Sequence, residues 1–315
     1  MQKITLGRSG IAVPPVIFGC NVFGWTVDKA QTFRLLDGLV EAGLNALDTA
    51  DVYSYWVPGN KGGESETLMG EWLKARGRRH DVVILSKGGM EMPGLGKGIS
   101  AAWLTQAVED SLRRLGTDVI DLYQAHKDDT VTPHEETLGA FQRMIEAGKV
   151  RAIGASNYSV PRFKEALAAS ARHNLPRYET MQPHYNLLER GIEADLLPLC
   201  AAEGVGVIPY YSLASGFLSG KYRSEADLGK SLRGARGAGQ YLNPKGLKVL
   251  AALDAVAARY GATPAQVALA WFKGRPGLAA PIASATSLEQ LAELAKAANL
   301  TLDAAATAAL DAAGA

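Results

Sequence analysis

Four side chains suited to proton transfer follow successive short apolar runs of the sequence: Asp48, Tyr53, Lys87 and His126. A carbonyl oxygen on which negative charge develops needs a proton donor, which the hydroxyl of Tyr53 can supply. The ammonium of Lys87 would stabilise a phenolate and lower the pKa of Tyr53 from its ordinary value of about 10. Asp48 would hold and neutralise Lys87, and His126 would orient the carbonyl oxygen through a hydrogen bond.

Alternation of short apolar runs with amphipathic segments would position these side chains. The segment around Leu104, Val108, Leu112 and Leu115 shows the apolar spacing of a helix. Strands that alternate with helices favour parallel pairing, and eight such units in 315 residues favour one closed (β/α)8 TIM barrel over residues 1–315. The predicted strands are Val16–Gly19, Ala46–Asp48, Val82–Ser86, Val119–Tyr123, Val150–Gly154, Thr180–Gln182, Gly206–Pro209 and Ala279–Ile282.

Residues at the ends of the predicted strands and helices indicate a hairpin, two helix starts and the location of the active site. Lys3–Leu6 and Ile11–Val13 predict a β-hairpin that plugs the N-terminal end of the barrel. The segments that begin Thr132-Pro133 and Thr263-Pro264 predict helix starts with a capping hydroxyl, and His134 is expected at the surface. Active sites of such barrels lie at the C-terminal ends of the strands. Polar residues expected at that end are Asp48, Tyr53, Lys87, His126, Ser156, Asn157, Gln182 and Tyr210.

These residues stand in motifs that resemble the aldo-keto reductase family over nearly the whole chain. The resemblance implies a reversible hydride transfer between a nicotinamide cofactor and an aldehyde or ketone, with Tyr53 as general acid and base. The family's catalytic Asp, Tyr, Lys and His match the four side chains described first. The matching segments, in order, are Leu47–Tyr53, Leu85–Lys87, Asp121–His126, Gly148–Asn157, Gln182–Asn186 and Leu218–Tyr222.

No Gly-x-Gly-x-x-Gly segment follows a strand and opens a helix, so a dinucleotide would be held by another device. The resemblance implies an extended cofactor across the barrel mouth. Its carboxamide would bind Ser156, Asn157 and Gln182, and its nicotinamide would stack on Tyr210. Its pyrophosphate would face Leu213, Ser215 and Lys221, with Arg233 completing the clamp or standing as a solvated loop residue. Further candidate contacts are Gly19, Asn21 and Asp48, and Ser284, Thr286, Gln290 and Glu293 at the adenosine half.

The choice between the two nicotinamide cofactors depends on the adenosine half. Ala283-Ser284 replaces the family's usual Pro-Gly, and Leu294 stands where an Asn is common. No Lys or Arg among these residues would pair with a 2′-phosphate. No acidic residue replaces the neutral donors to bind a ribose 2′-hydroxyl, however, which favours NADP(H) and leaves NAD(H) as the alternative. Gln290 also fits a helix capping box with Ser287.

Substrate selectivity would come from the long loop after Tyr53, where Tyr55 and Trp56 can wall an apolar carbonyl pocket. Phe23, Trp25 and Met90 are weaker candidates for this wall, with packing as the alternative. Cys20 is interpreted as a buried small residue, or else as a residue that lines the cofactor site.

Composition limits the partners. Lys and Arg (33) nearly balance Asp and Glu (32), so small molecules are expected rather than nucleic acid or a membrane. No signal peptide and no run of about 20 apolar residues is present, which predicts a cytoplasmic protein. Cys20 and Cys200 cannot form a disulfide framework, and no Cys/His cluster has zinc-ligand spacing, so a reduced, metal-free protein is expected. The oligomeric state stays open.

Two alternatives of other classes stay open. A cofactor-binding regulatory protein resembling potassium-channel β subunits would keep the same residues, and only turnover and a partner would distinguish it from an enzyme. A metal- or phosphate-dependent barrel lyase or isomerase would need clustered ligands at the strand ends, which the sequence does not show. An enzyme acting on a small carbonyl or alcohol substrate is the favoured interpretation.

Overall fold

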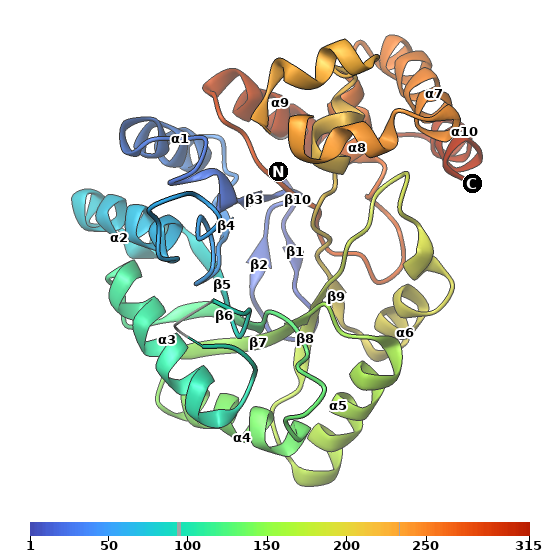
Figure 1. Ribbon diagram of the computed structural model, residues 1–315. Helices are drawn as coiled ribbons and strands as arrows, with labels where there is room; N and C mark the ends of the chain where they lie inside the picture. The colour runs from blue at the N-terminus through green and yellow to red at the C-terminus, as the bar shows by residue number, and fades with distance from the viewer. Residues whose placement is uncertain (93–95, 233) are drawn as a thin grey trace.

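Figure 1 shows a ring of strands surrounded by helices in the computed structural model, which describes residues 1–92, 96–232 and 234–315. Within these residues an 8-stranded parallel sheet runs in the order β10-β3-β4-β5-β6-β7-β8-β9. The two ends of this row meet, because Val207 N donates to Gly277 O (2.8 Å) and Ala279 N donates to Val207 O (2.8 Å). The sheet therefore closes into the predicted (β/α)8 barrel. Its strands are β3 (Ile17–Gly19), β4 (Ala46–Asp48), β5 (Val83–Gly88), β6 (Ile120–Ala125), β7 (Val150–Ser156), β8 (Tyr178–Gln182), β9 (Gly206–Val207) and β10 (Ile282–Ala283).

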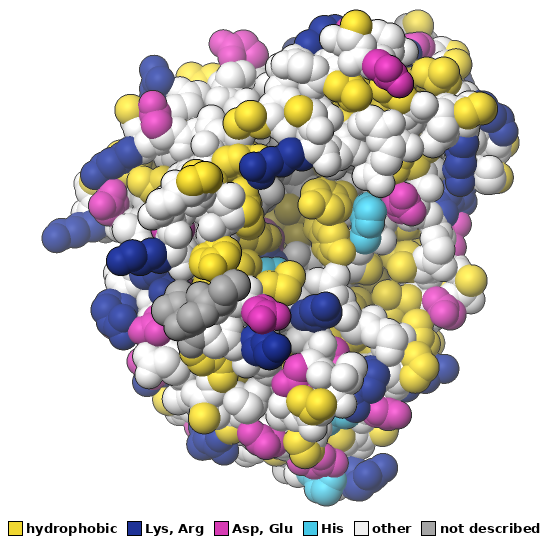
Figure 2. All heavy atoms as spheres, viewed as in Figure 1, with side chains coloured by type: hydrophobic (Ala, Val, Ile, Leu, Met, Phe, Trp, Pro, Cys, Tyr) yellow, Lys and Arg dark blue, Asp and Glu magenta, His cyan; other side chains and the backbone are white. Residues whose placement is uncertain are grey.

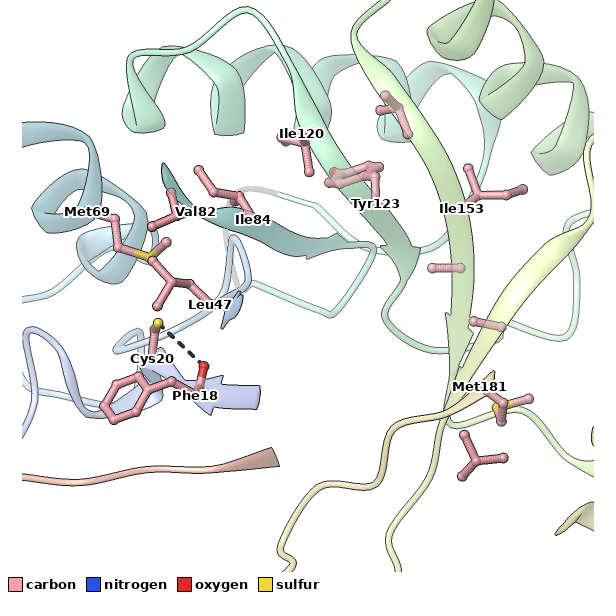
Figure 3. Packing of buried hydrophobic residues seen from close by; sticks show 14 of the residues in the cluster. Phe18, Cys20, Leu47, Met69, Val82, Ile84, Ile120, Tyr123, Ile153 and Met181 are labelled. Carbon is pink, nitrogen blue, oxygen red and sulfur yellow. Dashed lines mark hydrogen bonds between the residues drawn. The ribbon is translucent and has the colours of Figure 1, made fainter. Parts of the chain in front are cut away.

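Side chains alternate between the barrel interior and the helical layer along each strand. On β6, Leu122 joins the interior cluster, whereas Tyr123 packs outward with the residues that contact the helices. Figure 3 shows residues of this outer layer, among them Ile84 on β5 and Tyr123 on β6. The alternation fixes which strand-end side chains face the barrel mouth.

Helices cover the outside of the ring. The stripe of α3 predicted from spacing is confirmed, since Leu104, Val108, Leu112 and Leu115 are all buried. Within the described residues, no helix is both long and apolar enough to cross a membrane. The helices are α1 (Lys29–Glu41), α2 (Glu64–Arg76), α3 (Ala101–Leu115), α4 (His134–Glu146), α5 (Val160–His173), α6 (Leu196–Glu203), α7 (Pro244–Tyr260), α8 (Pro264–Ala270), α9 (Leu288–Asn299) and α10 (Ala304–Gly314).

The predicted N-terminal hairpin is also confirmed. Strand β1 (Ile4–Thr5) pairs antiparallel with β2 (Ala12–Val13), and the hairpin lies behind the ring in Figure 1. Its residues Leu6, Ile11 and Val13 are buried in one cluster with interior side chains of the barrel strands. The hairpin thus fills the N-terminal end of the barrel and leaves the opposite end open.

One of the two predicted helix caps is wrong. Thr263 accepts from Gln266 N and completes the expected capping box, but helix α4 is preceded by Pro133, and Thr132 donates its hydroxyl to Asp129 (2.5 Å) instead. His134 therefore lies at the first helical position and is not at the surface. Its ring is 6 % exposed and stacks on Tyr158 with centroids 6.3 Å apart.

Two glycines inside helices provide a matched test of packing. A Cβ on Gly70 of α2 would overlap the carbonyl oxygen of Arg114, so close approach of α2 and α3 requires glycine there. Around Gly139 of α4 the nearest atom to such a Cβ lies 3.7 Å away. We expect Gly70→Ala to lower the free energy of unfolding by about 1–3 kcal/mol. Gly139→Ala should raise it by about 0.5–1 kcal/mol, and urea denaturation that ranks the two variants the other way would contradict this packing.

Candidate functional site

Inward-facing positions at the C-terminal ends of neighbouring strands bring the predicted catalytic residues together. Asp48 pairs with Leu85 across β4 and β5, and Lys87 pairs with Gln124 across β5 and β6. Because side chains two residues apart on a strand share a face, Lys87 points inward above Leu85, which lies in the interior cluster. The register thereby places Asp48 and Lys87 side by side at the open end.

The ammonium of Lys87 is fully buried and fully bonded. Nζ donates to Asp48 Oδ2 (2.7 Å), to Thr49 O (2.8 Å) and to the Tyr53 hydroxyl (2.9 Å). Lys87 is 0 % and Asp48 1 % exposed, so the two charges neutralise each other away from water. Lys87 as donor occupies a lone pair of the Tyr53 oxygen, so the hydroxyl proton is free to point elsewhere, and in this structure its acceptor is Asp48 at a long 3.4 Å.

Asp48 accepts further hydrogen bonds that fix its orientation. Its Oδ1 accepts from Gln182 Nε2 (3.0 Å) and from Gln124 Nε2 (3.5 Å), and its Oδ2 accepts from the Tyr53 hydroxyl at 3.4 Å. Gln182 also donates to Gln124 Oε1 (3.2 Å). These contacts hold the carboxylate in place from β6 and β8.

Tyr53 does not have the lowered pKa that its lysine neighbour suggested. Burial, followed by the negative charge of Asp48, raises the pKa of Tyr53 well above its ordinary value. The expectation that the ammonium of Lys87 outweighs these effects is therefore wrong. A raised pKa keeps the hydroxyl protonated at neutral pH, which suits a proton donor.

His126 stands beside Tyr53 at the end of β6. Their ring centroids are 6.2 Å apart at an angle of 74°, and the His126 ring is 7 % exposed. Burial, and then the charge of Lys87, lowers the pKa of His126, so its imidazole is neutral at pH 7. A neutral imidazole carries one N–H donor, which can bond a carbonyl oxygen in the mouth.

The residues expected at the nicotinamide form one hydrogen-bonded group. Asn157 Nδ2 donates to Ser156 Oγ (3.0 Å) and to His126 O (3.0 Å), and Tyr210 donates its hydroxyl to Asn157 Oδ1 (2.8 Å). The ring of Tyr210 stacks on His184 with centroids 5.4 Å apart and an angle of 18°. One face of Tyr210 is therefore occupied by His184, and a stacked nicotinamide would use the other.

Three further residues predicted to contact the cofactor, Gly19, Asn21 and Ser284, lie together where β10 and β3 adjoin. Ser284 donates its hydroxyl to Asn21 Oδ1 (2.9 Å), and a Cβ on Gly19 would lie 2.8 Å from Ser284 Oγ. Cys20 is 0 % exposed with its thiol 3.7 Å from Phe18 O, and Figure 3 shows it facing Leu47. Its interpretation as a buried small residue is confirmed.

The loop after β9 has an unusual backbone. Tyr211, Ala214 and Ser215 have φ of 53°, 49° and 57°, a left-handed conformation rare outside glycine and concentrated at functional sites. Two N–H groups of this loop are bonded within it, because Ala214 N donates to Tyr211 O (2.7 Å) and Gly216 N donates to Leu213 O (2.8 Å). Lys221 lies over this loop, because its Nζ is 3.5 Å from the place of a Cβ on Gly216. Leu213 precedes this turn, and Arg233 lies outside the described residues.

The residues expected at the adenosine half bond mainly to one another. Gln290 Oε1 accepts from Thr286 N (2.9 Å), and Ser287 caps α9 by accepting from Gln290 N (3.3 Å). Glu293 Oε2 accepts from Gln266 Nε2 (2.8 Å) at the start of α8. Gln290 and Glu293 thus have structural partners, while their predicted contacts to a cofactor stay predictions.

Tyr53, Trp56 and Trp25 pack against one another and form an aromatic wall at the barrel mouth. Trp56 lies edge-on to Tyr53 (6.1 Å between centroids) and to Trp25 (5.6 Å). Tyr55 instead packs in the cluster around Val52 and Met92, as does Met90, and Phe23 is fully buried. Figure 2 shows this open face of the barrel, hollowed at its centre, with hydrophobic side chains lining much of the hollow and Lys or Arg on its rim.

Comparison with known proteins agrees with this geometry. Residues 15–315 match the sequence model of the Aldo/keto reductase family. The chain belongs to this family. Among its relatives, the uncharacterized oxidoreductase YrpG of Bacillus subtilis is 33% identical over 96% of this chain and 93% of its own length. The aldo-keto reductase AFTS1 of Alternaria alternata is 33% identical over 91% and 85%, and a probable voltage-gated potassium channel subunit beta of Oryza sativa is 34% identical over 94% and 91%.

Aldo/keto reductases as a family use nicotinamide cofactors, and membership supports an oxidoreductase. The residues of this chain fit such a group in two respects. Lys221 beside the left-handed loop offers a positive charge for a pyrophosphate, and Gln182, whose amide nitrogen is bonded to Asp48, has its Oε1 to accept from a carboxamide.

Sequence reasoning missed two residues of this aldo/keto reductase site. Gln124 bonds Asp48, and the signal for it was its place two residues after Leu122 on one strand, where both face inward, and two residues before His126. His184 stacks on Tyr210, but its segment carries no strand pattern, so its position was not predictable.

Proposed function

We propose that this protein is an NADP(H)-dependent reductase of aldehydes or ketones, with Tyr53 as the general acid and base. The observation that carries the proposal is the 2.9 Å contact of Lys87 Nζ with the Tyr53 hydroxyl, inside a pair of buried charges completed by Asp48. A tyrosine held in this way beside an aromatic wall suits protonation of a carbonyl oxygen.

When bound, the reduced nicotinamide supplies a hydride to the carbonyl carbon. Tyr53 gives its hydroxyl proton to the carbonyl oxygen as the C=O π-bond becomes an O–H bond, and the product is an alcohol. Lys87, bonded to the same hydroxyl oxygen, stabilises the phenolate that remains. His126, with a neutral ring, donates to the carbonyl oxygen and orients it toward Tyr53. In the reverse direction the Tyr53 phenolate accepts the proton of the alcohol.

A titration of tryptophan fluorescence with NADPH and NADH tests the cofactor, since Trp25 and Trp56 stand at the mouth. A panel of aldehydes and ketones, followed by the loss of reduced cofactor, then tests the reaction. We expect NADPH to quench the fluorescence and at least one carbonyl class to be turned over. Saturable binding of neither cofactor would overturn the proposal.

Substitution of two basic residues, Arg233 and Lys221, tests separately how the protein binds the 2′-phosphate and the pyrophosphate. A charge-assisted contact contributes about 1.5–3 kcal/mol, so Arg233→Ala should weaken NADPH binding by about 10–150-fold if Arg233 binds the 2′-phosphate, and NADH binding should barely change. Lys221→Ala, at the left-handed loop, should weaken both cofactors alike. Equal binding of both cofactors by the unaltered protein, or equal losses in Arg233→Ala, would remove the support for NADP(H).

A second candidate function is that of a cofactor-binding regulatory subunit with little turnover. It is favoured by the 34% identity to a probable voltage-gated potassium channel subunit beta of Oryza sativa. Tight NADPH binding with no turnover of any carbonyl class would select this candidate, whereas multiple turnovers lost in Tyr53→Phe would select the reductase.

A further inference from the structure

Asp51 lies in the turn between Asp48 and Tyr53, and its buried carboxyl group has no side-chain partner among the described residues. The residue is 1 % exposed, and the one group that favours its carboxylate through a hydrogen bond is the neighbouring backbone N–H of Val52. An ionised carboxylate in such a place is costly, so the group holds a proton or the structure opens to water. The proposed reaction does not use this carboxyl group.

The surroundings of Asp51 disfavour its ionised form. Glu66 is fully buried and bonds Ser86 Oγ (2.5 Å) and Arg114 Nε (2.7 Å), so the positive charge of Arg114 is already paired. Burial and then the charge of Glu66 raise the pKa of Asp51 to about 8, against the opposing effects of the Arg114 charge, the Val52 N–H and the Lys87 charge. The titratable and charged groups that face Asp51 are Glu66 on α2, Arg114 on α3, Lys87 on β5 and Tyr123 on β6.

The turn that carries Asp51 also holds the catalytic side chains. Asp51 N donates to Lys87 O (3.1 Å), and Thr49 O accepts from Lys87 Nζ (2.8 Å). Tyr53 N donates to Ala50 O (3.2 Å) within the same turn. Movement of Asp51 toward water would therefore shift both the carbonyl that holds the ammonium and the residue that carries the reacting hydroxyl.

We propose that Asp51 is a positioning residue for Tyr53 and Lys87 that must keep its proton, and that its ionisation displaces the turn and slows carbonyl reduction. The proposal rests on the proposed function, because it concerns the geometry around Tyr53. Ionised Asp51 would face the buried carboxylate of Glu66, and the turn relieves this repulsion by moving toward solvent.

The pH dependence of kcat/KM for reduction tests this role. We expect the value to fall by up to tenfold per pH unit above about pH 8, because the protonated fraction of Asp51 falls at that rate.

Three variants test whether Asp51 causes this fall. The asparagine in Asp51→Asn cannot ionise, so the ratio of the activity of this variant at about pH 9 to its activity at about pH 6.5 should stay near one. Glu66→Gln should move the midpoint to lower pH. Asp128→Asn is the matched control, since that buried carboxylate is already paired with Arg162 (2.7 Å), and it should keep the original midpoint.

Unfolding by urea gives a readout that does not need turnover. Folding raises the pKa of Asp51 from 3.8 to about 8, so the folded state holds a proton that the unfolded state loses across this range. The stability that Asp51 contributes is present below about pH 4 and is lost as the pH rises to about 8. The gain in stability from Asp51→Asn should therefore grow across this interval and then level off.

The two readouts separate failure of this proposal from failure of the proposed function. A stability gain that does not change with pH, or an alkaline loss of activity retained in Asp51→Asn, overturns the role of Asp51. Absence of reduction in the unaltered protein at every pH overturns the proposed function and, with it, the positioning role.

Discussion

Replacing Tyr53 with phenylalanine should lower the rate of carbonyl reduction by about 10²–10⁴-fold, the usual contribution of a general acid. The substitution removes the hydroxyl that bonds Lys87 Nζ (2.9 Å) and leaves the ring against Trp56 and His126. Cofactor affinity, measured by fluorescence titration, should stay unchanged because the predicted contacts to the cofactor lie elsewhere in the mouth. Single-turnover rates separate the chemical step from product release.

His126→Gln serves as the companion variant for Tyr53→Phe. It removes the imidazole beside Tyr53 but keeps the hydroxyl, so we expect a smaller loss of rate and a poorer discrimination between carbonyl substrates. Near-normal turnover by Tyr53→Phe would take Tyr53 out of the mechanism.

Lys87→Met should lose most of the activity and also destabilise the fold. The substitution leaves the carboxylate of Asp48, 1 % exposed, without its cation, and breaking such a buried pair costs about 3–5 kcal/mol. Loss of the ammonium also destabilises the Tyr53 phenolate, so the alkaline limb of the reverse oxidation should move to higher pH. Urea denaturation and the pH–rate profile measure the two effects.

The double variant Asp48→Asn with Lys87→Met distinguishes folding from chemistry. Removal of both charges should recover much of the stability lost in Lys87→Met, because no unpaired ion is left buried. Activity should stay low, since the Tyr53 hydroxyl still lacks its ammonium neighbour. If the double variant regains activity along with stability, Lys87 serves the fold and not the proton transfer.

Much of the fold was predictable because each strand carries its own local signal. Apolar runs located all eight barrel strands but not their bounds: β7 continues to Ser156, and β9 ends at Val207, two residues before the predicted end. The last strand is furthest from its prediction, because β10 shares only Ile282 with the predicted Ala279–Ile282. The extent of a strand depends on which backbone groups a neighbour offers, and that information lies in other segments. The wrong cap at Thr132 has a local origin instead, because Asp129, three residues earlier, accepts from the Thr132 hydroxyl.

The group of Asp48, Tyr53, Lys87 and His126 was predictable because its members stand at or after the ends of successive strands. The protonation states of these residues were not predictable. The raised pKa of Tyr53 depends on how deeply the neighbouring segments bury it, and the raised pKa of Asp51 depends on its burial and on Glu66, whose position only packing determines. Likewise, His134 is buried because Tyr158, on a different loop, lies over it. Spacing along the chain gives the candidates, whereas packing sets their protonation.

The plug at the N-terminal end of the barrel has a consequence for biosynthesis. Arg8, in the hairpin turn, donates its backbone N–H to Glu179 (2.7 Å), a residue 171 positions later in the chain, and its guanidinium reaches Glu203 O (3.0 Å). At a translation rate of about 5–20 residues per second, these partners leave the ribosome on the order of 10–40 s after the hairpin does. Throughout that interval Leu6, Ile11 and Val13 have no barrel interior to enter, so these apolar side chains stay exposed on the nascent chain until the later strands are made.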